Sequence, residues 1–216
     1  MNRTRKMVMI LAAFVTVTFA AAQADLIVLQ TAPLGNNTVD WSTTGFAVGH
    51  QSHGFLGYSV GGDTATATVA APIGNKGELV QQGNNWNGDF AAGEYAIWTN
   101  THGPLTVSFG NNYNAVGAYF QPDFYGAFTV TLKVFNGNTL LGTLTESGNS
   151  TVTPGTALYI GALDQSGPNI TKVEFSDTTN FAVGTMFLGV PEPGTLVLLG
   201  TGLLGLAGLA HRRMRR

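Results

Sequence analysis

Alternation of apolar and polar residues at a spacing of two is the pattern that most constrains the fold of this 216-residue chain. It is clearest in AFTVTLKVF, residues 127–135, where every second residue from Phe128 to Val134 is apolar and the residues between are Thr or Lys. Side chains of a strand point alternately to its two faces, so this period indicates a strand with one buried face. LTVSF, residues 105–109, and TKVEF, residues 171–175, show the same alternation.

Turns rich in glycine and asparagine separate these runs. Asn136-Gly137 is a strong signal for a two-residue hairpin turn, so strand 128–135 is expected to pair with strand 138–145. No amphipathic stretch of helical length stands out. The pattern predicts an all-β domain, an antiparallel β-sandwich or jelly roll. Further strands are expected at 26–30, 55–60, 64–70, 78–82, 94–99, 115–120, 157–161 and 181–187.

The first 24 residues have the parts of an export signal. A basic head is followed by an apolar stretch over residues 7–20 and by Ala22-Gln23-Ala24, which places small residues where signal peptidase requires them. We therefore expect residues 1–24 to be a signal peptide that is cleaved between Ala24 and Asp25. An uncleaved membrane anchor is the alternative.

A second apolar run lies near the other end, where residues 195–210 contain no charge. A helix of this length measures ~24 Å, somewhat less than the ~30 Å hydrocarbon core of a bilayer. We expect a single transmembrane helix here rather than a buried core helix, because a basic cluster follows it and would hold that end in the cytoplasm. The cluster consists of Arg212, Arg213, Arg215 and Arg216.

The order of elements in residues 190–216 resembles the PEP-CTERM sorting signal. Pro191-Glu192-Pro193 comes first, then the apolar run with its glycines, then the arginines. The resemblance implies recognition by an exosortase in the inner membrane, processing near the Pro-Glu-Pro motif, and release to the cell surface or an exopolysaccharide matrix. We therefore expect three parts: a signal peptide at 1–24, a β-sandwich ectodomain at 25–189 and a PEP-CTERM sorting segment at 190–216.

Charge and cysteine content exclude several classes of function. The formal net charge is −2, but between Asp25 and Val190 there are three Lys against seven Asp and four Glu, a balance of 3 − 11 = −8. Such a body should not bind nucleic acid, since that binding depends on cationic side chains. The chain has no cysteine, which excludes disulfides, thiol catalysis and thiolate metal sites.

One loop stands out as a candidate binding site. In GNNWNGDF, residues 83–90, Trp86 could cover the face of a sugar ring while Asn87 and Asp89 meet its hydroxyl groups. Oxygen-rich loops can also hold calcium, although no metal or cofactor site is predicted. The alternative is an ordinary turn whose Trp packs inward. QPDFYGAF, residues 121–128, forms a second candidate loop, which contains Asp123, Phe124 and Tyr125.

These observations favour a non-enzymatic exported protein of the cell surface or exopolysaccharide matrix. The alternatives are an exported carbohydrate-binding module and a secreted hydrolase. The hydrolase has the least support, because no nucleophile–base set and no carboxylate pair is visible in the sequence. An apolar cleft holding two carboxylates would favour the hydrolase, a concave surface with Trp86 exposed would favour the binding module, and a smooth sandwich would favour the matrix role.

Overall fold

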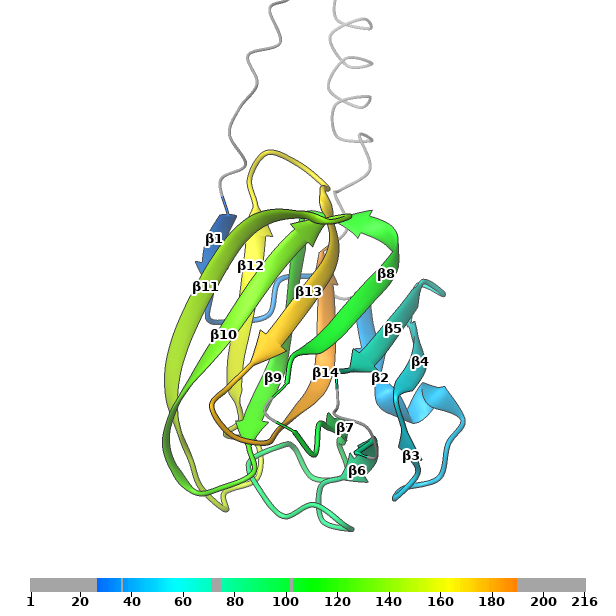
Figure 1. The fold of residues 1–216 in the computed structure, drawn as a ribbon, viewed down its shortest axis with the longest axis vertical. Coiled ribbons are helices and arrows are strands. Elements are labelled where there is room, and N and C mark those ends of the chain that lie inside the picture. Colours follow the sequence, from blue (N-terminus) through cyan, green and yellow to red (C-terminus); the bar gives the residue numbers. More distant parts are fainter. Residues whose placement is uncertain (1–26, 36, 71–74, 102, 190–216) are drawn as a thin grey trace, which may run out of the picture.

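The chain between residues 27 and 189 folds as an antiparallel β-sandwich. The computed structural model describes residues 27–35, 37–70, 75–101 and 103–189 (Figure 1). Every strand pairing between these elements is antiparallel, which confirms the all-β prediction. The strands are β1 Ile27–Gln30, β2 Asn37–Asp40, β3 Gln51–Ser52, β4 Gly54–Ser59, β5 Thr64–Val69, β6 Gly77–Gln81, β7 Tyr95–Trp98, β8 Leu105–Tyr113, β9 Ala115–Pro122, β10 Gly126–Asn136, β11 Thr139–Ser150, β12 Leu158–Asp164, β13 Ile170–Ser176 and β14 Phe181–Gly189.

The strands form one continuous sheet that folds over on itself into two layers. Its order is β1-β12-β9-β14-β2-β4-β5-β8-β13-β10-β11, and β6 and β7 extend it beside β14. Figure 1 shows β8, β13, β10 and β11 in front of β12, β9 and β14, with β4 and β5 to the right of them. The core lies between the layers, where side chains such as Leu132 of β10 and Ile160 of β12 are fully buried.

The predicted alternation of β10 is confirmed. Val130, Leu132 and Val134 are completely buried, and Phe128 is nearly so, while the residues between them face outward. The predicted hairpin is also present, with its turn one residue later than expected, since Asn136 pairs with Thr139. Gly137 takes φ +56°, the left-handed value that a type II′ turn requires at its first central position.

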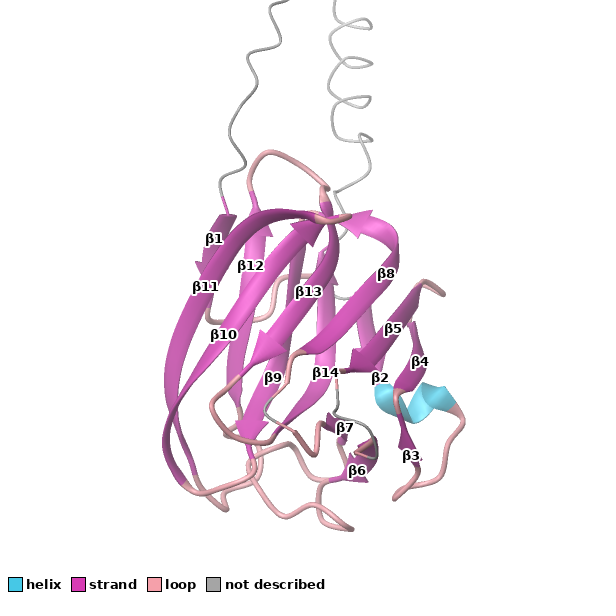
Figure 2. Ribbon diagram, viewed as in Figure 1, coloured by secondary structure: helices cyan, strands magenta, loops and turns pink. Residues whose placement is uncertain are grey.

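Two short strands and a helical turn have no counterpart in the predicted strands. These are β2, β3 and η1, a 3₁₀ helix at Trp41–Thr44 that is the only helix among the described residues (Figure 2). Trp41 is completely buried, and its indole nitrogen donates to the Gly184 carbonyl oxygen over 2.8 Å. No helix within the described ranges is long and apolar enough to cross a bilayer, and the predicted span at 195–210 lies outside them.

The sandwich has two distinct ends. At one end Ile27 pairs with Asp164, Leu163 with Ala115, and Ala115 with Gly189, so the first and last described residues lie close together. At the opposite end β9 finishes at Pro122, which pairs with Phe181 at the start of β14. The β6–β7 connection, residues 82–94, and the β9–β10 connection, residues 123–125, also lie there (Figure 1).

Candidate functional site

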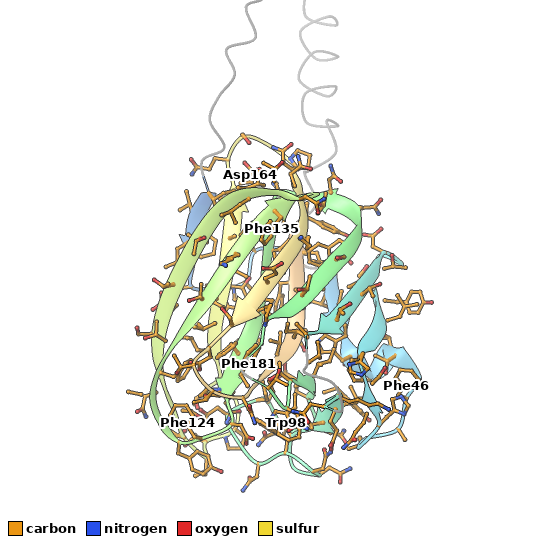
Figure 3. The ribbon with its side chains drawn as sticks, in the orientation of Figure 1. Phe46, Trp98, Phe124, Phe135, Asp164 and Phe181 are labelled. Carbon is orange, nitrogen blue, oxygen red and sulfur yellow. The ribbon has the colours of Figure 1, made fainter. Side chains whose placement is uncertain are left out.

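A cleft of about 320 Å³ lies at the end of the sandwich remote from Ile27 and Gly189. Figure 3 shows Trp98 and Phe124 at this end, with Asp164 at the other. Four aromatic side chains and five side chains with amide or carboxylate groups line the cleft, a mixture that suits a ligand with both apolar faces and hydroxyl groups. The lining residues are Glu78, Val80, Asn85, Trp86, Asn87, Trp98, Gln121, Pro122, Asp123, Phe124 and Tyr125.

Sheet register explains how strands that are distant in sequence supply this surface. Glu78 of β6 lies opposite Trp98 of β7, Trp98 lies opposite Ala182 of β14, and Ala182 lies opposite Gln121 of β9. Residues directly opposite one another point to the same face of a sheet. The four side chains therefore form one row across the outer face, and the loop at 82–94 covers that face.

The loop at 82–94 is fixed to the sheet by a small second core. Phe90 is completely buried and packs with Val80, Ala96 and Ala182, and the rings of Trp86 and Trp98 pack against this cluster. The two indole rings have centroids 6.5 Å apart. The loop therefore holds Trp86 half-buried, with one part of its ring in the small core and another part lining the cleft.

Gln121 sets the orientation of Trp86. Its side chain is only 2% exposed, and its Oε1 accepts hydrogen bonds from the Trp86 indole nitrogen over 3.1 Å and from the Asp89 backbone nitrogen over 2.8 Å. Its Nε2 donates to Oγ of Ser150 over 3.2 Å. A Cβ atom at position 88 would collide with this amide, so the loop can approach Gln121 closely only because residue 88 is glycine.

The two candidate loops predicted from sequence meet in the cleft. Trp86 and Asn87 line it together with Asp123, Phe124 and Tyr125. The Tyr125 hydroxyl donates to the Asn87 carbonyl oxygen over 2.8 Å, which ties the loops to each other. Phe124 is 36% exposed and Tyr125 is 57% exposed, so both rings are accessible to a ligand.

Asp89, predicted as a third glycan contact, is turned away from the cleft. It is 2% exposed, and its two carboxylate oxygens accept from the backbone nitrogen and the hydroxyl of Thr151, each over 2.7 Å. Its carbonyl oxygen accepts from the backbone nitrogens of residues 155–157. Asp89 therefore anchors the β11–β12 connection to the loop at 82–94.

Two carboxylates line the cleft. Oε1 of Glu78 accepts from the Asn85 amide over 2.9 Å, and Oε2 accepts from the Gln51 amide over 3.2 Å. Asp123 lies at the exposed rim, where desolvation by its neighbours raises the pKa of its carboxyl group and the Trp98 indole N–H acts in the opposite direction. Among the described residues, no group of three or more His, Cys, Asp or Glu side chains is arranged to hold a metal ion.

The remaining predicted sites lie outside the described residues. They are the cleavage site at Ala22, Ala24 and Asp25, the Pro191-Glu192-Pro193 motif, and the basic cluster Arg212, Arg213, Arg215 and Arg216. Glu78, Trp98 and Gln121 were not predicted to be site residues, although Gln121 begins the second candidate loop. The one signal available for Gln121 was a polar residue near the end of the otherwise apolar strand AVGAYFQP.

Comparison with protein-family models identifies a PEP-CTERM protein-sorting motif at residues 189–213. The chain carries a PEP-CTERM sorting motif. The match confirms the predicted class, a substrate of exosortase-type enzymes that is exported and transiently anchored in a membrane. No curated protein and no solved structure matches the chain. The PEP-CTERM assignment therefore describes how the protein is sorted, and the cleft must be interpreted from its own chemistry.

Proposed function

We propose that this PEP-CTERM protein is a non-enzymatic component of the cell surface or exopolysaccharide matrix that binds polysaccharide through the cleft. The observation that carries the proposal is the composition of the cleft walls. Trp86, Trp98, Phe124 and Tyr125 offer aromatic faces to the C–H faces of sugar rings, and neighbouring amide and carboxylate groups can bind the hydroxyls.

Preorganisation supports binding by this surface. Trp86 is held by Gln121, and Tyr125 is held by the carbonyl oxygen of Asn87. Side chains that are already fixed lose less conformational entropy when a ligand binds. Weak contacts at single sugar rings then add up along a polymer, which suits a matrix protein with many copies.

The test compares two exposed tyrosines. Tyr125 lines the cleft and is 57% exposed, whereas Tyr58 of β4 is 45% exposed and lies outside it. Tyr125→Ala should weaken retention on immobilised polysaccharide by about tenfold, as expected for removal of an aromatic anchor. Tyr58→Ala should be retained like the parent. Equal retention of the parent and Tyr125→Ala would exclude the cleft as the binding site.

A secreted glycan hydrolase is the second candidate, because Glu78 and Asp123 line the same cleft. Glycosidases use two carboxyl groups of different protonation state, and the raised pKa of Asp123 fits the acid of such a pair. Hydrolysis would release new reducing ends from polysaccharide incubated with the parent protein, and Glu78→Gln would abolish their release. Absence of new reducing ends with the parent supports the binding role.

A further inference from the structure

The cleft is acidic and has no basic group on its walls. Glu78 and Asp123 are its only ionisable carboxylates, and none of the eleven lining residues is Lys, Arg or His. The single ion pair among the described residues joins Lys172 to Glu174 on β13, far from this end of the sheet. Neither Glu78 nor Asp123 forms an ion pair with a described residue, and Lys76, two residues before Glu78, is exposed.

Glu78 is held in the cleft by hydrogen bonds to both of its carboxylate oxygens. Both of its oxygens accept from amide groups, those of Asn85 and Gln51, and neither amide carries charge. Asp123 differs, because no hydrogen bond to its carboxylate from a cationic side chain is present among the described residues and its neighbours desolvate it. A cation bound beside Asp123 would compensate for that desolvation.

Aromatic faces add a second attraction for positive charge. The π-system of an indole or phenol ring attracts a cation placed within about 6 Å of its centre. The ring planes of Trp86 and Trp98 are inclined to each other by 51°. The two ring faces therefore meet at an angle where the small core borders the cleft. Phe124 and Tyr125 follow Asp123 directly in the chain, so rings and carboxylate occupy the same rim.

We infer that the cleft selects a glycan that carries ammonium groups, such as a partly deacetylated amino-sugar polymer, over neutral and acidic glycans. Carboxylates beside aromatic faces bind an ammonium group in water. The carboxylate and the aromatic ring both attract the cation, and neither interaction requires a buried unpaired charge. An acidic polysaccharide would instead meet two like charges. The inference deepens the proposed function and rests on it.

Titration calorimetry of the full-length protein in detergent micelles at about pH 6 tests the inference, because carboxylates are generally ionised there. The probes are glucosamine hexamer, N-acetylglucosamine hexamer, galacturonic acid hexamer and hexalysine. Glucosamine hexamer should bind about tenfold more tightly than its N-acetylated counterpart, and the galacturonic acid hexamer should not bind. Asp123→Asn should remove most of the preference for the free amine.

Glu146→Gln is the matched control, since it removes a carboxylate of β11 that does not line the cleft. Its preference for glucosamine hexamer over N-acetylglucosamine hexamer should equal that of the parent. Equal binding of the two glucosamine probes overturns the inference while the proposed function stands. Binding of hexalysine as tight as that of glucosamine hexamer also overturns it, because charge alone would then explain the result. If no sugar probe binds, the proposed function itself falls.

Discussion

Gln121→Leu is expected to destabilise the loop that carries Trp86. The substitution keeps a side chain of similar size at a position that is 2% exposed but removes its hydrogen-bonding groups. The backbone N–H of Asp89 and the indole N–H of Trp86 then lose the oxygen that both donate to, and Ser150 loses a donor.

The expected loss in the free energy of unfolding follows from the N–H donors that are left without an acceptor. A buried donor without a partner costs about 1–3 kcal/mol. The Asp89 nitrogen is buried and should cost that amount, whereas the half-buried Trp86 nitrogen can recover part of its loss from water. A loss of about 2–4 kcal/mol is expected. For a domain of this size that corresponds to a fall in Tm of about 4–16 °C.

Thermal unfolding followed by circular dichroism measures the global effect, and amide hydrogen exchange over residues 82–94 measures the local one. Gln81→Leu is the control, because the hydrogen bonds of Gln81 to Gly93 and Asn84 are solvent-exposed. It should change stability by less than about 0.5–1 kcal/mol. If Gln121→Leu unfolds at the same temperature as the parent and its loop exchanges no faster, Gln121 does not hold Trp86 in place.

Three further predictions concern charge and processing. Asp123 has a raised pKa in the folded state. Its stabilising contribution is therefore present below its unfolded pKa of about 3.9 and is lost as the pH rises through its folded pKa. Asp123→Asn should raise Tm at about pH 7, and the difference in Tm between variant and parent should shrink below about pH 4. An unchanged difference across that range would rule out this titration as its cause. The mature N-terminus should be Asp25 by mass spectrometry of the exported protein, and retention of Met1 in the membrane fraction would refute cleavage there. Replacing all four arginines after residue 211 by Ser should impair sorting, because the inside end of the anchor loses its charge bias; unchanged processing on an immunoblot would count against that reasoning.

The strands were predictable where one sequence period decides the structure. In β10 the alternation from Phe128 to Val134 specifies the strand and its buried face, and Asn136-Gly137 indicates the hairpin. The structure confirms the strand, the face and the hairpin, whose turn lies one residue later than predicted. NTVD in β2 is too short and too polar to show a period. Its pairing with β14 and β4 depends on long-range contacts that no local pattern contains.

The candidate site was predictable in its parts and not in its assembly. Trp86 and Asn87 were identified because an aromatic residue among amides is unusual in a turn. The loop of Asp123 was identified because it too places aromatic residues beside a polar one. Their meeting depends on the register that places Glu78, Trp98 and Gln121 in one row across four strands. Asp89 resembles a ligand-binding residue in sequence, and only its contacts with Thr151 reveal a structural role.

The cleft lies at one end of the sandwich and Gly189 lies at the other, and this arrangement determines how the protein faces its surroundings. Strand β14 runs from Phe181 beside the cleft to Gly189, directly before the sorting segment, and its nine residues span roughly 26 Å. The cleft therefore lies at the end of the body opposite the residue that precedes the sorting segment. Under the proposed function, copies anchored through that segment would offer their clefts on the side remote from Gly189, and one polymer strand would contact several copies before their release.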